Sequence, residues 1–457
     1  MPPRPLFVRR RIWSALPWRI RRQVERAVLA SLRFLPAEDT LRVAEGEGDA
    51  SLVAVGDMAL SGEVEESYRR RGARAMAGGL FEILTSADLR VGNLETQFTA
   101  GNFPAGDERG IIKASPDMAQ LLSEWRFDAV TVANNHALDY GEQGLKDSLK
   151  TLDARGIGHC GGGDSAGAAR APARMRVKDL TVGMLGYCDD YRAAGGDEQL
   201  ATTRDEAILE DIGRLRAQVD LVILQIHWGY EFALYPFLSH RERPRRFAEA
   251  GADLVLCHHA HVPMGLERWK GKLIAYGLGN LLFYRSNYLG QHPWSRRSFV
   301  LQVSFGKSGV HKARLIPCGI TDECTIDALG DPARREVLGA VKALSGRLGD
   351  DEFLAAIEWD RTIREGLQMV ENLALGANDG SDAAWALQLR TPRHRELLRD
   401  LKGAEISRPI GDLLESAAGA GGLNGAGLGE AARKAIARLR TEADLPHGDL
   451  PGRTPYT

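Results

Sequence analysis

Short apolar runs alternate with amphipathic stretches along the chain from Ser51 onward. Residues 144–155 and 204–217 place Leu or Ile three and four residues apart, a spacing that predicts helices with one buried face. The apolar runs between such stretches predict buried strands, and this alternation is typical of layered α/β proteins. The predicted strands are residues 52–55, 89–91, 129–133, 182–185, 221–226, 254–257, 273–276 and 299–303.

Near Asp331 the pattern changes to Ala, Arg, Leu and Glu at helical spacing, as in residues 332–344 and 353–375. This spacing predicts a helical extension after the α/β domain. Residues 418–429 are rich in Gly and Ala, which indicates a flexible loop or linker. The predicted parts are a basic amphipathic N-terminal segment at residues 1–45, the α/β domain at 46–325, the helical extension at 326–445 and a disordered tail at 446–457.

Several predicted strands end directly in a polar side chain. Residues that stand at such positions are Asp57, Asn93, Asn134, His227 and His258. Ligands and catalytic groups of open α/β sheets collect at the carboxyl ends of the strands. The sequence therefore predicts a single cleft lined by these strand ends.

The composition agrees with one large domain plus added elements. A length of 457 residues exceeds the usual domain size of roughly 100–200 residues. Hydrophobic residues make up 44% of the chain and charged residues 26%, as in ordinary globular proteins. The 59 basic and 61 acidic side chains leave a net charge of −2, which provides no global field for nucleic acid. We therefore predict no specific nucleic-acid partner.

The five cysteines are odd in number and form no CxxC pair. They indicate neither a disulfide framework nor a zinc ribbon, and a reducing, cytoplasmic compartment fits them best. Cys257 ends an apolar run and is predicted to be a buried strand residue.

The N-terminal segment is strongly basic, with seven arginines before the first acidic residue, Glu25. Arginines interrupt its apolar stretches, so neither a signal peptide nor a membrane span is predicted there. Trp13, Leu16 and Trp18 could belong to the apolar side of a basic amphipathic helix. Such a helix either packs on its own domain or makes a peripheral contact with an acidic partner or the inner membrane face.

Three histidine-containing elements carry the candidate chemistry: residues 134–136 (Asn-Asn-His), 227–229 (His-Trp-Gly) and 258–261 (His-His-Ala-His). In an extended segment His259 and His261 would point the same way, because side chains alternate along a strand. An H-x-H pair of this kind can supply two imidazoles to neighbouring metal positions.

Carboxylates complete the predicted donor set. Asp57 follows a glycine at a strand end, and Glu95 follows the next predicted strand. Mixed Asp, Glu, Asn and His donors suit Mn, Zn or Fe, whereas Ca and Mg favour shells of oxygen alone. We therefore expect one or two divalent metal ions per chain, with positions open to water.

The series VAVGDMALSG, VGNLET, VANNHALDYG, LQIHWGYEF, GADLVLCHHAHV and IAYGLGNLLF resembles, in order and spacing, the CapA family of capsule and poly-γ-glutamate biosynthesis proteins. That family looks like a branch of the calcineurin-like metallophosphoesterase superfamily. The resemblance covers residues 51 to about 317. It implies a four-layer αββα sandwich that holds a two-metal centre, and the predicted C-terminal helical extension follows it.

The resemblance also implies a set of site residues. His136 would assist proton transfer, and the Gly279-Asn280 turn would shape the cleft floor. The usual D-x-H motif is represented by Asp57 with Ala59 two residues on, so one ligand of the first metal is missing. His258 and Ala260 stand where the family usually has Gly and Pro. The residues implied as metal ligands are Asp57, Glu95 (with Asn93 nearby), Asn135, His227, His259 and His261.

Hydrolysis of a phosphoester or amide bond is the default reaction for such a centre, because paired metals activate water as a nucleophile. Asp57, Glu95 and His136 would be the catalytic residues, with His136 protonating the leaving group. Substrate phosphate or carboxylate groups would be bound by Arg285, Arg296 and Arg297, whose alternative interpretation is solvated loop charge.

Two other functions remain open at this stage. The same metals could acidify a Cα–H bond and support epimerisation of a ribosomal, lasso-type peptide precursor. The protein could instead be a non-catalytic scaffold of a capsule or polyglutamate assembly. The predicted partner is therefore a phosphorylated, polyglutamate or peptide substrate.

Overall fold

The computed structural model describes residues 39–46, 48–102, 104, 112–189, 198–283, 292, 294–355 and 357–358. The predicted N-terminal segment up to residue 38, most of the helical extension and the tail lie outside these residues. The chain divides into two compact units, and nearly all described residues belong to the unit formed mainly by residues 32–189 and 196–349. The description below concerns that unit.

A nine-stranded sheet has the order β1-β16-β15-β2-β3-β6-β7, with β14 beside β2 and β17 beside β16. Strands β2, β3, β6, β7 and β14 run parallel, whereas β15 pairs antiparallel with β2. The bounds are β1 (Thr40–Arg42), β2 (Ala50–Met58), β3 (Leu89–Leu94), β6 (Ala129–Thr131), β7 (Gly158–Cys160), β14 (Asn280–Leu282), β15 (Arg297–Gly306), β16 (Gly309–Ile320) and β17 (Ile326–Ala328).

A six-stranded sheet has the order β12-β13-β11-β10-β9-β8. Its four central strands are parallel and its two edge strands antiparallel. The bounds are β8 (Ala173–Val177), β9 (Leu180–Cys188), β10 (Leu221–His227), β11 (Leu254–His258), β12 (Leu266–Trp269) and β13 (Lys272–Ala275). A separate pair is formed by β4 (Gln97–Phe98) and β5 (Lys113–Ala114).

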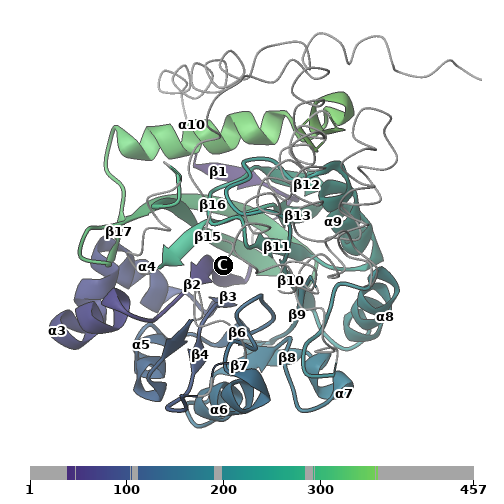
Figure 1. Ribbon diagram of the computed structural model, residues 1–457. Helices are drawn as coiled ribbons and strands as arrows, with labels where there is room; N and C mark the ends of the chain where they lie inside the picture. The colour runs from purple at the N-terminus through teal and green to yellow at the C-terminus, as the bar shows by residue number, and fades with distance from the viewer. Residues whose placement is uncertain are drawn as a thin grey trace, which may run out of the picture. The chain divides into compact units, whose positions relative to one another are not determined.

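Helices flank both sheets (Figure 1). Side chains of α3, α5 and α6 share one apolar core with β2 and β6, while α8 and α9 contact β10 and β11. Helix α10 contacts β12, β15 and β16. The bounds are α3 (Glu63–Ala77), α4 (Phe81–Ser86), α5 (Ala119–Glu124), α6 (Gly141–Asp153), α7 (Ala166–Ala169), α8 (Asp205–Arg216), α9 (Leu238–Ala250) and α10 (Ala333–Gly346), with 3₁₀ turns at Gly78–Leu80 and Pro116–Met118.

The two sheets approach each other closely at Gly186 of β9. A Cβ atom built there would lie 2.2 Å from Thr131 Oγ1 of β6 and 3.0 Å from Cys160 Sγ of β7. Sheet therefore packs on sheet, with helices outside. The predicted four-layer αββα class is confirmed.

Each of the eight apolar runs coincides with a strand, although the runs 129–133 and 273–276 extend past the ends of β6 and β13. The two helical spacings correspond to α6 and α8. The long strand β16 was missed because exposed Lys312 and Arg314 alternate with its buried residues and break any apolar run. Its partner β1 falls within the predicted N-terminal segment, and β17 and α10 follow residue 325. The folded unit thus extends past both boundaries expected for the α/β domain.

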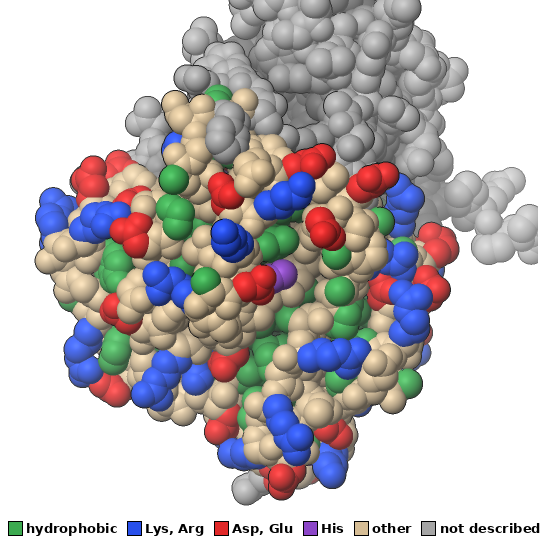
Figure 2. Space-filling view, turned by 90° about the horizontal axis from the view of Figure 1, so that it is seen from below, with side chains coloured by type: hydrophobic (Ala, Val, Ile, Leu, Met, Phe, Trp, Pro, Cys, Tyr) green, Lys and Arg blue, Asp and Glu red, His purple; other side chains and the backbone are tan. Residues whose placement is uncertain are grey.

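Charge is mixed on the surface. Figure 2 shows Lys and Arg side chains interspersed with Asp and Glu over one face. Many charged side chains of the described residues form ion pairs, such as Arg69 with Glu65 and Arg74 with Glu82. Within the described residues, no helix combines the length and apolar character needed to cross a membrane.

The close approach of the sheets makes a prediction about stability. Gly186→Ala should lower the free energy of unfolding by about 1–3 kcal/mol, because the added methyl group overlaps Thr131. The matched control is Gly213→Ala on α8, where a Cβ meets no atom within 4 Å. It should leave stability unchanged or raise it by up to about 1 kcal/mol. Urea denaturation measures both, and equal midpoints for the two variants would contradict the packing.

Candidate metal centre

Neighbouring strand ends bring the predicted site residues together. Asp57, the second-last residue of β2, pairs with Asn93 of β3 on one side and with Asn280 of β14 on the other. In the second sheet, β10 and β11 end side by side at His227 and His258. The carboxyl ends of strands from both sheets therefore bring these polar side chains together, as the sequence predicted.

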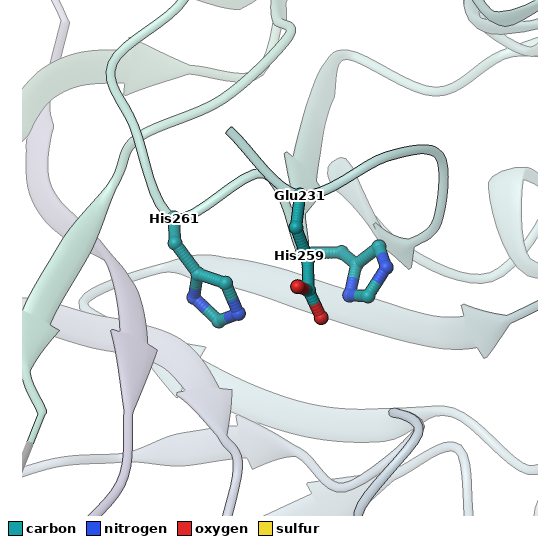
Figure 3. A group of neighbouring side chains, drawn as sticks. All are labelled: Glu231, His259 and His261. Carbon is teal, nitrogen blue, oxygen red and sulfur yellow. The ribbon is translucent and has the colours of Figure 1, made fainter. Parts of the chain in front are cut away.

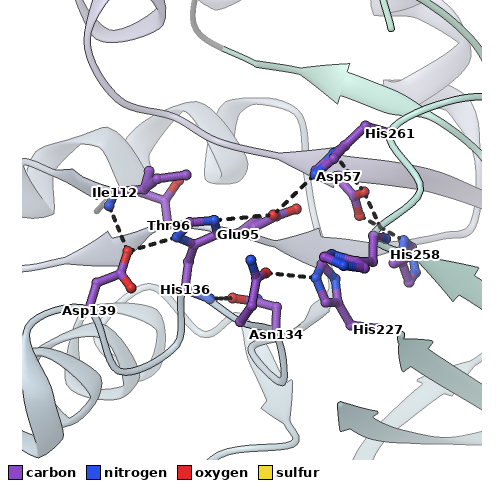
Figure 4. Close-up of polar contacts among 12 residues, drawn as sticks. Asp57, Glu95, Thr96, Ile112, Asn134, His136, Asp139, His227, His258 and His261 are labelled. Atoms are coloured by element: carbon purple, nitrogen blue, oxygen red, sulfur yellow. Dashed lines mark hydrogen bonds and ion pairs between the residues drawn. The ribbon is translucent and has the colours of Figure 1, made fainter. Parts of the chain in front are cut away.

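Asp57 is buried, with 1% of its surface exposed, and groups from several elements contact its carboxylate (Figure 4). Asn93 Nδ2 donates to Oδ1 at 2.8 Å, and the backbone N–H of His259 donates to Oδ2 at 3.1 Å. The Nδ1 atoms of His258 and His261 lie 3.1 and 3.3 Å from the carboxylate. Burial opposes ionisation, yet the hydrogen bonds to these two imidazoles hold the pKa of Asp57 well below its usual range.

Glu95 lies on the far side of Asn93 and is fully buried. Its Oε1 atom has no hydrogen-bond partner among the described residues, although His261 Nε2 and His136 Nε2 lie 3.7 and 3.8 Å away. Burial raises the pKa of this carboxyl to about 8, against the opposing charge of His261. A buried carboxylate oxygen left without a hydrogen bond is costly, and a bound cation would satisfy it.

His227 connects the two sheets at the centre of the cluster. Asn93 Nδ2 donates to its Nδ1 at 3.1 Å, and its Nε2 lies 2.8 Å from Asn135 Oδ1. Burial lowers the pKa of His227 well below its usual range, which keeps the imidazole neutral. The neutral ring is the form that binds a metal ion.

The His259–His261 segment differs from the expected extended strand. Strand β11 ends at His258, and the next turn holds His259 at φ 85° and His261 at φ 55°. These are left-handed values that non-glycine residues rarely adopt, and each costs on the order of 1–3 kcal/mol. The two rings still reach one cluster, with centroids 6.0 Å apart, but a turn rather than strand alternation puts them there.

His261 contacts an amide and two carboxylates. Its Nδ1 lies 2.8 Å from Asn280 Oδ1, and its Nε2 faces Glu95. Burial by itself disfavours the imidazolium, but the Glu95 and Asp57 carboxylates outweigh it and raise the pKa of His261 to about 10. The Gly279-Asn280 turn therefore orients a candidate ligand.

His136 stands at the edge of the cluster, half-buried, on the loop that follows β6. Its Nδ1 lies 2.8 Å from Asp139 Oδ2, a carboxylate oxygen that also accepts the backbone N–H of Ile112 at 2.7 Å. Burial lowers the pKa of His136, but Asp139 more than compensates and the net shift is upward. Asp139 thus orients the ring through Nδ1, and Nε2 faces Glu95.

The arginines predicted to bind substrate lie apart from these contacts. Arg296 pairs with Asp322 at 2.6 Å, and Arg297, the first residue of β15, pairs with Glu336 of α10 at 3.2 Å. Arg285 lies outside the described residues. Substrate binding by these side chains stays a prediction.

The structure shows contacts in the site that the sequence analysis did not give. Asn93 is a hub between Asp57 and His227, and His258 Nε2 lies 2.9 Å from Gln225 Oε1. Asp139, three residues after His136, and Glu231, four residues after His227, stood inside the quoted motifs and could have been found by their spacing. The contact between His258 and Gln225 could not have been found in this way, because it joins two strands.

The donors fit a divalent cation. Asp57, Glu95 and His227 each offer a ligand atom, and these atoms lie within 4.8 Å of one another. Asn135 contacts His227, and the ring of His259 lies 4.7 Å from that of His227. The six residues implied as ligands are therefore brought into one buried cluster, although their roles as ligands remain a prediction.

Known proteins resemble this chain over the same region. Residues 51–285 match the family described as bacterial capsule synthesis protein PGA_cap. The PGA biosynthesis protein CapA of Bacillus subtilis (strain 168) is 26% identical over 292 residues, which cover 62% of this chain and 75% of that protein. The capsule biosynthesis protein CapA of Bacillus anthracis is 25% identical over 285 residues, covering 60% and 68%.

A probable polyglutamine synthesis accessory protein of Mycobacterium tuberculosis (strain CDC 1551 / Oshkosh) is 30% identical over 213 residues, covering 43% of this chain and 56% of that protein. Among solved structures, the 5′-nucleotidase of Candida albicans SC5314 matches with a TM-score of 0.36 and 11% identity, covering 69% of this chain and 60% of that one. Since the matched segment 51–285 spans just over half of the 457 residues, the chain belongs to the bacterial capsule synthesis protein (PGA_cap) family.

Proposed function

We propose that this protein is a metal-dependent hydrolase that cleaves a phosphoester or amide bond. The observation that carries the proposal is the buried group of Asp57, Glu95 and His227, whose ligand atoms lie within 4.8 Å of one another. Two carboxylates and an imidazole at strand ends make a typical donor set for a catalytic metal.

Six residues would hold one or two ions of Mn, Zn or Fe: Asp57, Glu95, Asn135, His227, His259 and His261. When bound, such a cation polarises a substrate oxygen and activates water as a nucleophile. The protein orients its donors in advance, because Asn93 fixes Asp57 and His227 while Asn280 fixes His261. Hydrogen-bonded partners of this kind orient metal ligands in many metalloproteins.

His136 is the proposed proton donor to the leaving group. Asp139 holds its Nδ1, so Nε2 faces the cluster 3.8 Å from Glu95 Oε1. Its side chain is 17% exposed, which leaves the ring accessible to a substrate at the edge of the cluster. A histidine in this arrangement can deliver its proton as the bond breaks and recover it from solvent.

The proposed substrate is a polyglutamate chain or a phosphorylated precursor of it. The support is that relatives are described as PGA, capsule or polyglutamine synthesis proteins. Arg296 and Arg297 carry positive charge near the start of β15, next to Ser295, whose carbonyl oxygen accepts from Asn280 Nδ2 at 3.0 Å. A repeating carboxylate polymer presents the charge that such guanidinium groups bind.

Metal content tests the first step of the proposal. The purified protein reconstituted with Mn²⁺ should retain at least about one ion per chain, and Asp57→Asn should lose it while keeping its circular dichroism spectrum. The control is Asp179→Asn, an exposed carboxylate of the β8–β9 turn, which should keep wild-type metal content. Elemental analysis after gel filtration decides. Wild-type protein with less than about one ion would leave the scaffold interpretation standing instead.

The role of His136 predicts a kinetic effect. His136→Asn should lower kcat by about 10²–10⁴-fold with metal content unchanged, because the proton donor is lost. His159→Asn is the matched control, since His159 is a comparably buried histidine that pairs with Asp153 away from the cluster. A full rate for His136→Asn would refute its assignment.

The same assays identify the reaction. Phosphate release from aryl phosphates, or glutamate release from γ-linked glutamate oligomers, is the outcome expected for a hydrolase. Incubation of candidate peptides in heavy water provides the contrasting measurement. Deuterium at Cα without cleavage would replace hydrolysis by epimerisation.

A further inference from the structure

A second group of metal-binding side chains lies beside the first. Glu231, His259 and His261 each offer a ligand atom within 4.8 Å of the others, and Figure 3 shows the Glu231 carboxylate between the two rings. Two ligand atoms that each lie about 2.1 Å from one cation can be at most about 4.2 Å apart. The separations here are within 4.8 Å, so small side-chain rotations would bring the three donors to bonding distance.

The backbone holds Glu231 in this place. The N–H of Phe232 donates to the carbonyl oxygen of Ala260 at 2.8 Å, which ties the loop after β10 to the turn that carries both histidines. Phe232 adopts φ 58°, as His259 and His261 adopt positive values. Phe232, His259 and His261 thus all have left-handed backbone conformations, and they lie on the two segments that this hydrogen bond joins. Such strain persists only where the surrounding structure imposes it.

The second group adjoins the first through buried contacts. Glu95 Oε1, which is fully buried and has no hydrogen-bond partner among the described residues, lies 3.7 Å from His261 Nε2. The rings of His227 and His259 lie 4.7 Å apart. The two groups are therefore neighbours, and paired catalytic metals typically lie about 3.5–4 Å apart.

The D-x-H position explains why an extra donor is needed. Ala59 stands where a ligating histidine would be, and it is fully buried with no donor atom. Glu231 approaches from another loop and supplies an additional negatively charged oxygen. Glu231 is half-buried, whereas His259 and His261 are buried.

We propose that Glu231 is a metal ligand which, together with His259 and His261, forms a second cation position beside that of Asp57, Glu95 and His227. The inference rests on the proposed metal-dependent function and deepens it. The site is then binuclear despite Ala59, because a carboxylate from the loop after β10 adds a donor to the cluster.

Mn²⁺ binding to the full chain tests this assignment. Wild-type protein should bind about two ions, and Glu231→Gln should bind about one, since the amide keeps the shape of the side chain but loses its charge. Glu66→Gln on α3 is the control, because Glu66 is an exposed carboxylate that belongs to neither group of candidate ligands. Titration calorimetry and elemental analysis give the ion count independently of any activity.

The outcomes separate the two proposals. Glu231→Gln with wild-type ion count and affinity overturns the role of Glu231 and leaves the proposed function intact. Wild-type protein that binds a single ion overturns the second cation position alone. Wild-type protein that binds none overturns both. Glu231→Ala, which removes the side chain altogether, should reproduce the loss seen in Glu231→Gln if the carboxylate is a ligand.

Discussion

The buried carboxylate of Asp57 is the constraint around which this structure is arranged. Removing an ionised carboxylate from water is costly unless hydrogen bonds and opposite charge compensate it. The compensation comes from Asn93 on β3 and from the end of β11, where the backbone of His259 and the rings of His258 and His261 converge. The burial of this one carboxylate on β2 therefore requires strands of both sheets to end beside it.

The backbone beside Asp57 shows how little room this arrangement leaves. A Cβ atom on Gly56 would lie 1.7 Å from the carbonyl oxygen of Gly279, and the N–H of Asp57 donates to that same oxygen at 3.1 Å. Only glycine permits this approach of β2 to the turn before β14. The contact sets the position of Asn280, which in turn orients His261. Ligand geometry therefore depends on a backbone contact outside the donor set.

The family match and the site geometry are independent observations that point to the same residues. The match to capsule synthesis proteins covers residues 51–285, the segment that contains every candidate ligand. The structure then shows which of these side chains meet, and it gives His136 an orienting partner in Asp139. The reaction follows from neither alone, since a fold carries many chemistries and the site must decide among them. The donor set, with neutral His227 beside two buried carboxylates, is what favours metal-dependent hydrolysis.

The sequence by itself predicted the layered α/β class and eight strands, because buried strands read as continuous apolar runs. The six candidate ligands came from the resemblance of its motifs to a known family. The sequence did not determine β16, whose buried residues alternate with exposed Lys312 and Arg314, or its pairing with β1. Tertiary structure alone decided that a left-handed turn delivers His259 and His261, and that Glu231 reaches them from another loop. The reason is physical: periodicity reports which side of an element is buried, whereas contacts between distant loops depend on how the sheets pack.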